Sequence, residues 1–377
     1  MKSKIAIILG TRPEAIKLIP IYLELKNSND FEPLLISTGQ HASMLEQIFT
    51  LFEVKPDIEL SVMQPNQTLS SLTSVLFDKI GHLFANQKFD YVFVQGDTTT
   101  AYVSAVSSHY FQYKLVHVEA GLRTHDKWAP FPEEANRKMI GSIADIHFAA
   151  TDRAVNNLKN ENITNHVYMV GNSVIDSLLL TIHKISKRQD FYIDKFLNIL
   201  DDNKKTILVT GHRRESFGKG FKQICLALKT IAEQNKNCQI IYPVHLNPNI
   251  QNIVYDSLSK HENIHLIAPL PYDELVYIMS NSWLIITDSG GIQEEAPSLN
   301  VPLIVMRDKT ERQEGIESGC SILGGTKTHS ILVEFDKIMK SKSYYQKMAV
   351  AENPYGRGDT SKSILKALTI YNESSLI

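Results

Sequence analysis

The sequence predicts an α/β protein with two Rossmann-like, doubly wound domains. Apolar, β-branched runs recur along the chain with helical stretches between them. The runs are apolar throughout instead of alternating, as expected for parallel strands that are covered on both faces. The pattern stops in a polar stretch and then starts again, and a chain of 377 residues exceeds the size at which one core keeps growing.

The first series of runs predicts a parallel sheet in the N-terminal half. We expect its strands near residues 4–9, 33–37, 91–94, 115–118, 146–149 and 167–170. The segments between most of these runs are long enough for the crossover helices that parallel strands require. We therefore assign residues 1–171 to a first domain.

The second series begins after a stretch around residues 184–205 that is rich in lysine and aspartate. Its strands are expected near residues 207–210, 239–242, 264–268, 284–287 and 303–306. A second doubly wound domain therefore starts at residue 172. Because such sheets bind ligands beyond the carboxyl ends of their strands, we expect the ligand in the cleft between the two domains.

The overall charge excludes one large class of function. The chain has 39 Lys and Arg against 41 Asp and Glu, whereas binding to nucleic acid requires a basic surface. Its 3 cysteines have no CxxC spacing and suit packing in a reducing compartment. No apolar run has the length of a membrane span, and the first residues read as a strand instead of a signal peptide. We expect a cytoplasmic protein that binds neither nucleic acid nor membrane.

The turn after the first strand combines structural and basic residues. Thr11 and Glu14 have the spacing of a capping box, and Pro13 suits the first position of a helix. These roles leave Arg12 and Lys17 unexplained. Both side chains either reach a diphosphate at this helix start or are solvated.

Three acidic residues follow neighbouring strands or begin the next helix. Asp97 lies in QGDTTT, where capping the following helix is the alternative role. Glu119 lies in HVEAGLRT, where a glutamate has little use as a cap, and Glu133 lies in FPEEANR, where the helix dipole alone would explain it. If the three face one cleft, crowding raises one pKa and leaves a general acid beside a general base.

The most informative segment is TDSGGIQEEA at residues 287–296, which follows an apolar strand. A strand, a turn and a helix start place the backbone N–H groups of Ser289, Gly290 and Gly291 where phosphate oxygens can reach them. We expect Glu294 and Glu295, on the first helical turn, to take the hydroxyls of a ribose. The segment therefore predicts a nucleotide or a nucleotide-sugar as ligand.

Basic residues follow two other strands of the second domain. His212 is followed by two arginines, a set that favours an anionic ligand, although an exposed loop with salt bridges is the alternative. Arg312 is expected to pair with Glu295 or Asp308, or to point into the cleft.

Several familiar motifs are missing from the chain. No GxGxxG follows the first strand, and there is no GxxxxGK[ST] loop and no HExxH helix. We therefore expect neither a bound nicotinamide or flavin cofactor nor a metal.

The motifs together resemble one family, the bacterial non-hydrolysing UDP-N-acetylglucosamine 2-epimerases. The resemblance covers almost the whole chain and rests on GTRPEAIK (10–17), GDTTT (96–100), HVEAGLRT (117–124), FPEEANR (131–137), TGHRRESFG (210–218), YPVHLNPN (242–249), TDSGGIQEEAPSL (287–299) and NPYG (353–356). One departure is Gln95, which stands where a His is common in the family. These enzymes interconvert UDP-GlcNAc and UDP-ManNAc, so the resemblance implies a small-molecule substrate.

The resemblance also implies an architecture and a set of site residues. The architecture is a glycosyltransferase-B-like pair of domains, usually in a homodimer, in which a C-terminal helix at 361–377 packs back on the first domain, so that the second ends at 360. The implied catalytic residues are Asp97, Glu119, Glu133 and His212, the last beside the diphosphate. The implied substrate-binding residues are Arg12, Lys17, Leu270, Leu275, Ser289, Gly290, Gly291, Glu295 and Arg312.

The chemistry of the sugar limits the mechanism. The C2 proton is not acidic because no carbonyl lies next to it, so an enzyme either oxidises the sugar with NAD or expels the anomeric UDP. The missing dinucleotide motif favours expulsion to 2-acetamidoglucal, followed by re-addition of UDP. The alternatives are a hydrolysing 2-epimerase that releases ManNAc and UDP, a glycosyltransferase of the same fold, and a non-catalytic regulator that binds nucleotide-sugars.

Overall fold

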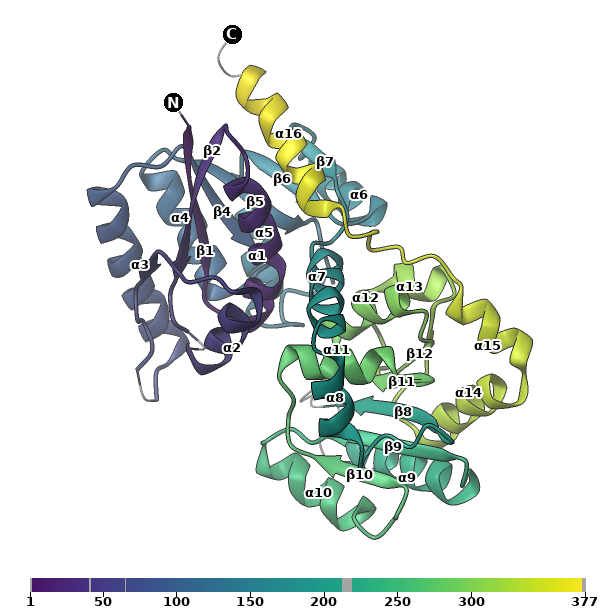
Figure 1. The fold of residues 1–377 in the computed structure, drawn as a ribbon. Coiled ribbons are helices and arrows are strands. Elements are labelled where there is room, and N and C mark those ends of the chain that lie inside the picture. The colour runs from purple at the N-terminus through teal and green to yellow at the C-terminus, as the bar shows by residue number, and fades with distance from the viewer. Residues whose placement is uncertain (1, 41, 65, 212–218, 375–377) are drawn as a thin grey trace. The chain divides into compact units, whose positions relative to one another are not determined.

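The chain divides into two compact units in a computed structural model that describes residues 2–40, 42–64, 66–211 and 219–374. The first unit comprises Met1–Leu179 and Tyr355–Ile377, and the second comprises Leu180–Pro354. The first expected domain boundary, after residue 171, lies a little before the point where the chain enters the second unit. The other, after residue 360, lies a little after the point where it returns to the first unit. Each unit contains one parallel sheet with helices packed against it (Figure 1).

The first unit is built on a 7-stranded sheet in the order β3-β2-β1-β4-β5-β6-β7. All neighbouring strands are parallel, and Ile7 of β1 lies beside Leu35 of β2 and Phe93 of β4. The elements in chain order are β1 (Ser3–Leu9), α1 (Arg12–Lys26), β2 (Phe31–Ser37), α2 (Ala42–Phe52), β3 (Ile58–Glu59), α3 (Leu69–Asn86), β4 (Tyr91–Gln95), α4 (Thr99–Tyr110), β5 (Lys114–Ala120), α5 (Glu133–Ile143), β6 (Ile146–Ala149), α6 (Asp152–Asn160), β7 (Val167–Met169), α7 (Val174–Ser186), whose last residues belong to the second unit, and α16 (Thr360–Ser374).

The second unit is built on a 6-stranded parallel sheet in the order β10-β9-β8-β11-β12-β13. Its elements are α8 (Gln189–Phe196), β8 (Lys205–Thr210), α9 (Lys219–Gln234), β9 (Cys238–Pro243), α10 (Pro248–Leu258), β10 (Ile264–Ile267), α11 (Tyr272–Ser280), β11 (Leu284–Thr287), α12 (Gly290–Glu295), the 3₁₀ helix η2 (Ala296–Leu299), β12 (Leu303–Val305), α13 (Gln313–Glu317), β13 (Ser321–Leu323), α14 (Thr328–Lys340) and α15 (Lys342–Ala349).

These strand orders confirm the predicted fold class of two doubly wound α/β domains. In each sheet the strand order reverses next to a central strand, β1 in the first unit and β8 in the second. Ligands of doubly wound sheets bind at this reversal, beyond the carboxyl ends of the strands. Ligand-binding residues are therefore expected after β1 and β4 in the first unit and after β8 and β11 in the second.

The apolar runs form the cores of the two units because both faces of each sheet are covered. Every residue from Ile5 to Leu9 is fully buried, and so are Leu284, Ile285 and Ile286 of β11. Within the described ranges, none of the helices combines the length and apolar character that a bilayer crossing needs.

The C-terminal helix α16 packs against α1 of the first unit (yellow in Figure 1). Asn372 accepts a hydrogen bond from the Tyr91 hydroxyl at 3.0 Å, and the Tyr371 hydroxyl accepts one from Lys114 at 3.2 Å. The Asp176 carboxylate accepts the N–H groups of Thr360 and Ser361 at 3.3 and 2.8 Å. Side chains from three elements therefore anchor both ends of this helix.

Three details differ from the sequence-based expectations. The edge strands β3 and β13, which are 2 and 3 residues long, were not predicted. Pro13 is the second residue of α1 instead of the first. Glu294 and Glu295 lie on the second turn of α12, not the first, because the helix begins at Gly290.

Candidate active site

Glu119, the next-to-last residue of β5, has a backbone conformation that is uncommon for a glutamate. Its φ is 62°, and the pairing of β5 with β6 is irregular between Val118 and Ala120. A left-handed, non-glycine residue costs free energy, and strained backbone of this kind clusters at functional sites. The carboxylate accepts hydrogen bonds from Lys17 Nζ, Gln95 Nε2 and, at 3.0 Å, Asn172 Nδ2. The Lys17 and Glu119 side chains are only 10% and 13% exposed, so this is a largely desolvated ion pair.

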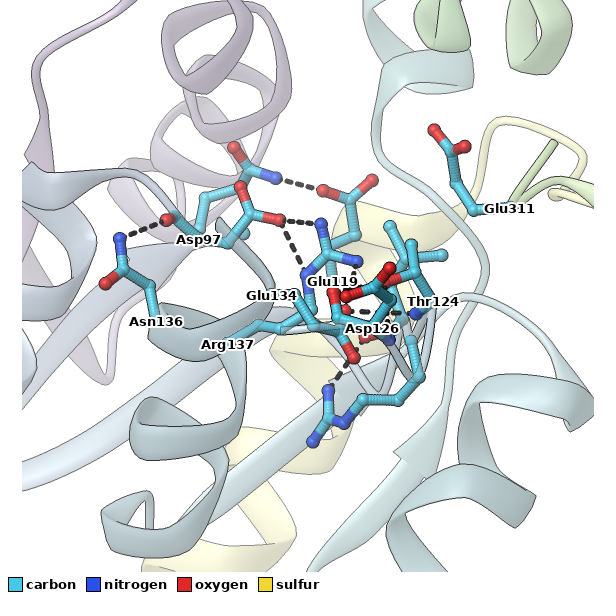
Figure 2. Close-up of polar contacts among 12 residues, drawn as sticks. Asp97, Glu119, Thr124, Asp126, Glu134, Asn136, Arg137 and Glu311 are labelled. Atoms are coloured by element: carbon cyan, nitrogen blue, oxygen red, sulfur yellow. Dashed lines mark hydrogen bonds and ion pairs between the residues drawn. The ribbon is translucent and has the colours of Figure 1, made fainter. Parts of the chain in front are cut away.

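Asp97 follows β4, the strand beside β5 in the sheet. It does not cap α4, because the Thr98 side chain accepts the N–H of Ala101 at 3.0 Å in that role. Its carboxylate instead forms an ion pair with Arg137 of α5, which lies against it in Figure 2. The Asp97 backbone carbonyl accepts a hydrogen bond from Asn136 at 2.9 Å. The capping alternative for Asp97 is therefore wrong.

The pKa of the Asp97 carboxyl is raised, chiefly because burial penalises its charged form. The charges of Glu119 and Glu133 raise this pKa further, while Arg137 lowers it. The sheet and α5 thus bring the three predicted acids close enough to interact electrostatically. One partly buried acid with a raised pKa beside a carboxylate that is held by a cation is a suitable arrangement for acid–base chemistry.

The two adjacent glutamates of α5 have different surroundings. Glu134 is fully buried and accepts the N–H groups of Thr124 and His125, both at 3.0 Å, and Arg137 Nη1 at 3.2 Å. Glu133, the first residue of α5, is only partly buried. Glu134 therefore has a structural role, because it holds the loop before the helix.

Glu14 is a buried carboxylate that the capping-box interpretation only partly described. It accepts the N–H groups of Gly10 and Thr11 at 3.0 and 2.7 Å, and the Thr98 hydroxyl at 2.6 Å. Burial raises the pKa of Glu14, and these hydrogen bonds oppose the increase. The turn after β1 is thereby tied to the turn after β4.

His117 of β5 fixes the neighbouring turn. Its Nε2 lies 2.8 Å from the Gly96 carbonyl, next to Asp97. Burial lowers the pKa of His117 to about 3, so the ring is neutral at pH 7 and donates this hydrogen bond.

In the second unit, Arg312 lies directly over the start of α12. A Cβ on Gly290 would be 2.6 Å from Arg312 Cζ, so a larger residue there would displace the guanidinium, whereas a Cβ on Gly291 would meet nothing within 4 Å. Arg312 pairs with Glu294 at 2.9 Å and with Glu311. These two partners were not among those expected for Arg312.

The other predicted nucleotide-binding residues of the second unit lie near the same turn or on α11. The Ser289 N–H donates to the Thr287 hydroxyl at 2.9 Å, so this amide already has an acceptor. Glu295 is buried and accepts the Tyr272 hydroxyl of α11 at 2.7 Å. Leu270 lies just before α11 and Leu275 within it, and both are partly buried. His212 lies outside the described residues.

Sequence reasoning missed the polar residues that support this site. Arg137 and Glu134 both lie in the FPEEANR motif. For Arg137 the available signal was its position four residues after Glu133 on the same helix, a spacing typical of an ion pair. Asn172 and Tyr272 carry no local signal, because their partners Glu119 and Glu295 are distant in the sequence. In the described ranges, no group of His, Cys, Asp or Glu could hold a metal ion.

Comparisons with known proteins agree on one family. A family model described as UDP-N-acetylglucosamine 2-epimerase matches residues 23–369. Proteins named UDP-N-acetylglucosamine 2-epimerase from Campylobacter jejuni and Salmonella typhimurium are 47% and 45% identical to this chain, over 98% of it and 98% and 100% of their own lengths.

Solved structures give the same result. The UDP-GlcNAc 2-epimerase of Neisseria meningitidis bound to UDP-GlcNAc has a TM-score of 0.93 and 41% identity, covering 97% of this chain and 99% of its own. The Methanocaldococcus jannaschii UDP-GlcNAc 2-epimerase in complex with UDP-GlcNAc and UDP has a TM-score of 0.83 and 32% identity, with the same coverage of 97% and 99%.

Proposed function

This chain belongs to the UDP-N-acetylglucosamine 2-epimerase family, and from that premise we propose that it interconverts UDP-GlcNAc and UDP-ManNAc without net hydrolysis. The observation that carries the proposal is the carboxylate arrangement at the ends of β4 and β5. Glu119 is held by Lys17, and Asp97 is partly buried with a raised pKa beside it. Inversion at one carbon requires acid–base groups on its two faces, and these carboxylates can supply them.

The proposed reaction balances in two steps. A base removes the C2 proton, the C2–H electron pair forms the C1–C2 double bond, and the C1–O bond electrons leave with UDP. The intermediate is 2-acetamidoglucal. A proton is then added to C2 from the opposite face, and a UDP oxygen bonds again to C1.

We assign the roles of base and acid by the surroundings of each carboxyl. The Lys17 ammonium and two amide donors stabilise the negative charge of Glu119, which suits a base. Burial favours the protonated form of Asp97, which suits an acid. Glu133 lies near enough to Asp97 to affect its charge and is the third candidate for proton transfer.

Freed UDP must be retained until it bonds again to C1. Cations near the diphosphate and backbone N–H groups at the start of α12 would stabilise the departing charge. The residues that we propose for this task are Arg12, Lys17, His212, Ser289, Gly290, Gly291 and Arg312, with Glu295 on the ribose and Leu270 and Leu275 beside the uracil. Loss of one preorganised contact of this kind typically costs about 3 kcal/mol of transition-state stabilisation.

Product analysis separates this proposal from its alternatives. Pure protein incubated with UDP-GlcNAc, without NAD or added metal, is expected to give UDP-ManNAc in an NMR spectrum. A hydrolysing enzyme would release free ManNAc and UDP instead. A glycosyltransferase would need an acceptor, and a regulator would leave the nucleotide-sugar unchanged.

We also propose that the enzyme works as a homodimer in the cytoplasm, as the family resemblance implies. Light scattering at known protein concentrations measures the oligomeric state directly. Cell fractionation with an antibody against the chain tests the compartment.

A further inference from the structure

Asn172 connects Glu119 to the segment where the chain leaves the first unit. Its Nδ2 donates to Glu119 Oε1 at 3.0 Å, and its own N–H donates to the Tyr355 carbonyl at 2.7 Å. The chain crosses to the second unit shortly after Asn172 and returns at Tyr355. Asn172 is 4% exposed, so its polar atoms depend on these protein partners.

The orientation of the Asn172 amide is fixed. Its Oδ1 accepts the N–H of Val174 at 3.1 Å, in the first residue of α7. With the oxygen engaged there, the NH₂ group must face Glu119, since a flipped amide would set an oxygen against a carboxylate. Asn172 is therefore a directed donor and not an adaptable one.

The next residue holds the other partner of the Glu119 ion pair. The Ser173 hydroxyl donates to the Lys17 backbone carbonyl at 2.6 Å, and Ser173 is 1% exposed. Residues 172 and 173 thus contact both the carboxylate and the segment that carries its cation. Gln95 donates to the second oxygen of Glu119, so neutral amides flank the group from two directions.

We propose that Asn172 is a positioning residue for proton transfer at C2, because its amide holds Glu119 Oε1 in place within the Lys17–Glu119 pair. This inference rests on the proposed function and adds a residue to it. Asn172 itself touches no reacting atom. It acts by fixing where the carboxylate lies and by stabilising its negative charge.

Asn172→Asp is the sharpest test, because the two side chains have the same shape and the new carboxylate still accepts the Val174 N–H. It replaces a donor by a negative charge beside Glu119. Titratable groups already face Glu119 from the neighbouring elements, namely Lys17 from α1, Asp97 after β4 and His117 within β5. All remain in the variant, so the electrostatic change is confined to position 172.

The expected result is a change in the pH profile. Two carboxylates that share a site do not ionise independently, so the acidic limb of kcat/KM should move to higher pH by about one unit. At neutral pH kcat should fall about ten- to a hundredfold, with KM changed much less. Asn372→Asp is the matched control. Its oxygen still accepts the Tyr91 hydroxyl, at the opposite end of β4 from Gln95, and its profile should equal that of the wild type.

A second measurement covers the case in which Asn172→Asp fails to fold. The stability of the single variant Asn172→Asp is compared with that of the double variant Asn172→Asp/Glu119→Gln. The double variant exchanges the carboxylate and the amide between the two positions and so restores a donor–acceptor pair. We expect the combined variant to be the more stable of the two. Equal instability in both backgrounds, or an Asn172→Asp pH profile that superimposes on the wild type, overturns the inference. Wild-type protein that fails to epimerise UDP-GlcNAc would instead refute the proposed function, while the stability comparison still tests the contact.

Discussion

The guanidinium of Arg137 forms an ion pair with the carboxylate of Asp97 and also reaches Glu134 through Nη1 at 3.2 Å. Asp97 is thus a partly buried acid with a raised pKa that Arg137 of α5 partly offsets, while the charge of Glu119 on the next strand is balanced by Lys17 from α1. Neighbouring strands therefore carry two carboxyls that are supported by different helices. This separation of surroundings allows one group to hold a proton while the other accepts one.

Arg137→Gln should raise the pKa of Asp97 further, because Arg137 lowers it in the folded protein. The limb of the kcat profile that reports Asp97 should move to higher pH. The measurement is kcat of UDP-GlcNAc epimerisation across the pH range. Lys138→Gln, at the exposed next position of α5, is the control and should leave the profile in place.

Glu119→Gln should abolish turnover while UDP still binds. General acid–base catalysis typically contributes about a hundred- to ten-thousandfold in rate, and the amide cannot take up a proton. Turnover is followed by NMR and UDP affinity by calorimetry. Glu59→Gln, an exposed site on β3, should behave as the wild type. Turnover by Glu119→Gln that approaches the wild-type rate would remove Glu119 from the mechanism.

Gly290→Ala should weaken UDP binding, and Gly291→Ala should not. The new methyl group at Gly290 would collide with the guanidinium of Arg312 and displace it from Glu294, whereas the space beside Gly291 is open. We expect roughly a tenfold or greater loss of UDP affinity, the equivalent of about 1.4 kcal/mol, for Gly290→Ala alone. Equal affinities in a calorimetric titration of both variants would contradict the proposed role of this turn.

Glu161→Gln tests a structural ion pair by its pH dependence. Arg123 donates to both Glu161 oxygens at 2.9 and 2.7 Å, and these bonds hold the pKa of Glu161 below its usual value. Because the folded-state pKa is depressed, this contribution is present above the unfolded pKa and is lost as pH falls through the folded one. The variant should lose about 1 kcal/mol of unfolding free energy at pH 7 and much less at pH 3, as measured by urea denaturation. A loss of the same size at both pH values would contradict this account.

The sequence predicted the sheets well because the strands are apolar throughout. Runs such as Ile5 to Leu9 are buried on both faces, so their composition alone identifies them. The short edge strands β3 and β13 carry no comparable signal. Most site residues lie in motifs that directly follow strands, and this placement is what sequence analysis can detect.

The supporting contacts could not be predicted in the same way. Asn172 and Glu119 are 53 positions apart, and only the folded sheet places them side by side. The Tyr272 hydroxyl donates a hydrogen bond to Glu295, which is 23 positions away, and no spacing rule predicts that pairing. Motifs thus supply the candidate residues, while the structure shows what each one contacts.

The central claim is that the C2 proton leaves the sugar and a solvent-derived proton returns to the other face. The most direct measurement is turnover of UDP-GlcNAc in D₂O, followed by NMR and mass spectrometry of the nucleotide-sugar product. The account predicts UDP-ManNAc that carries deuterium at C2. UDP-ManNAc formed with its original C2 proton would contradict it.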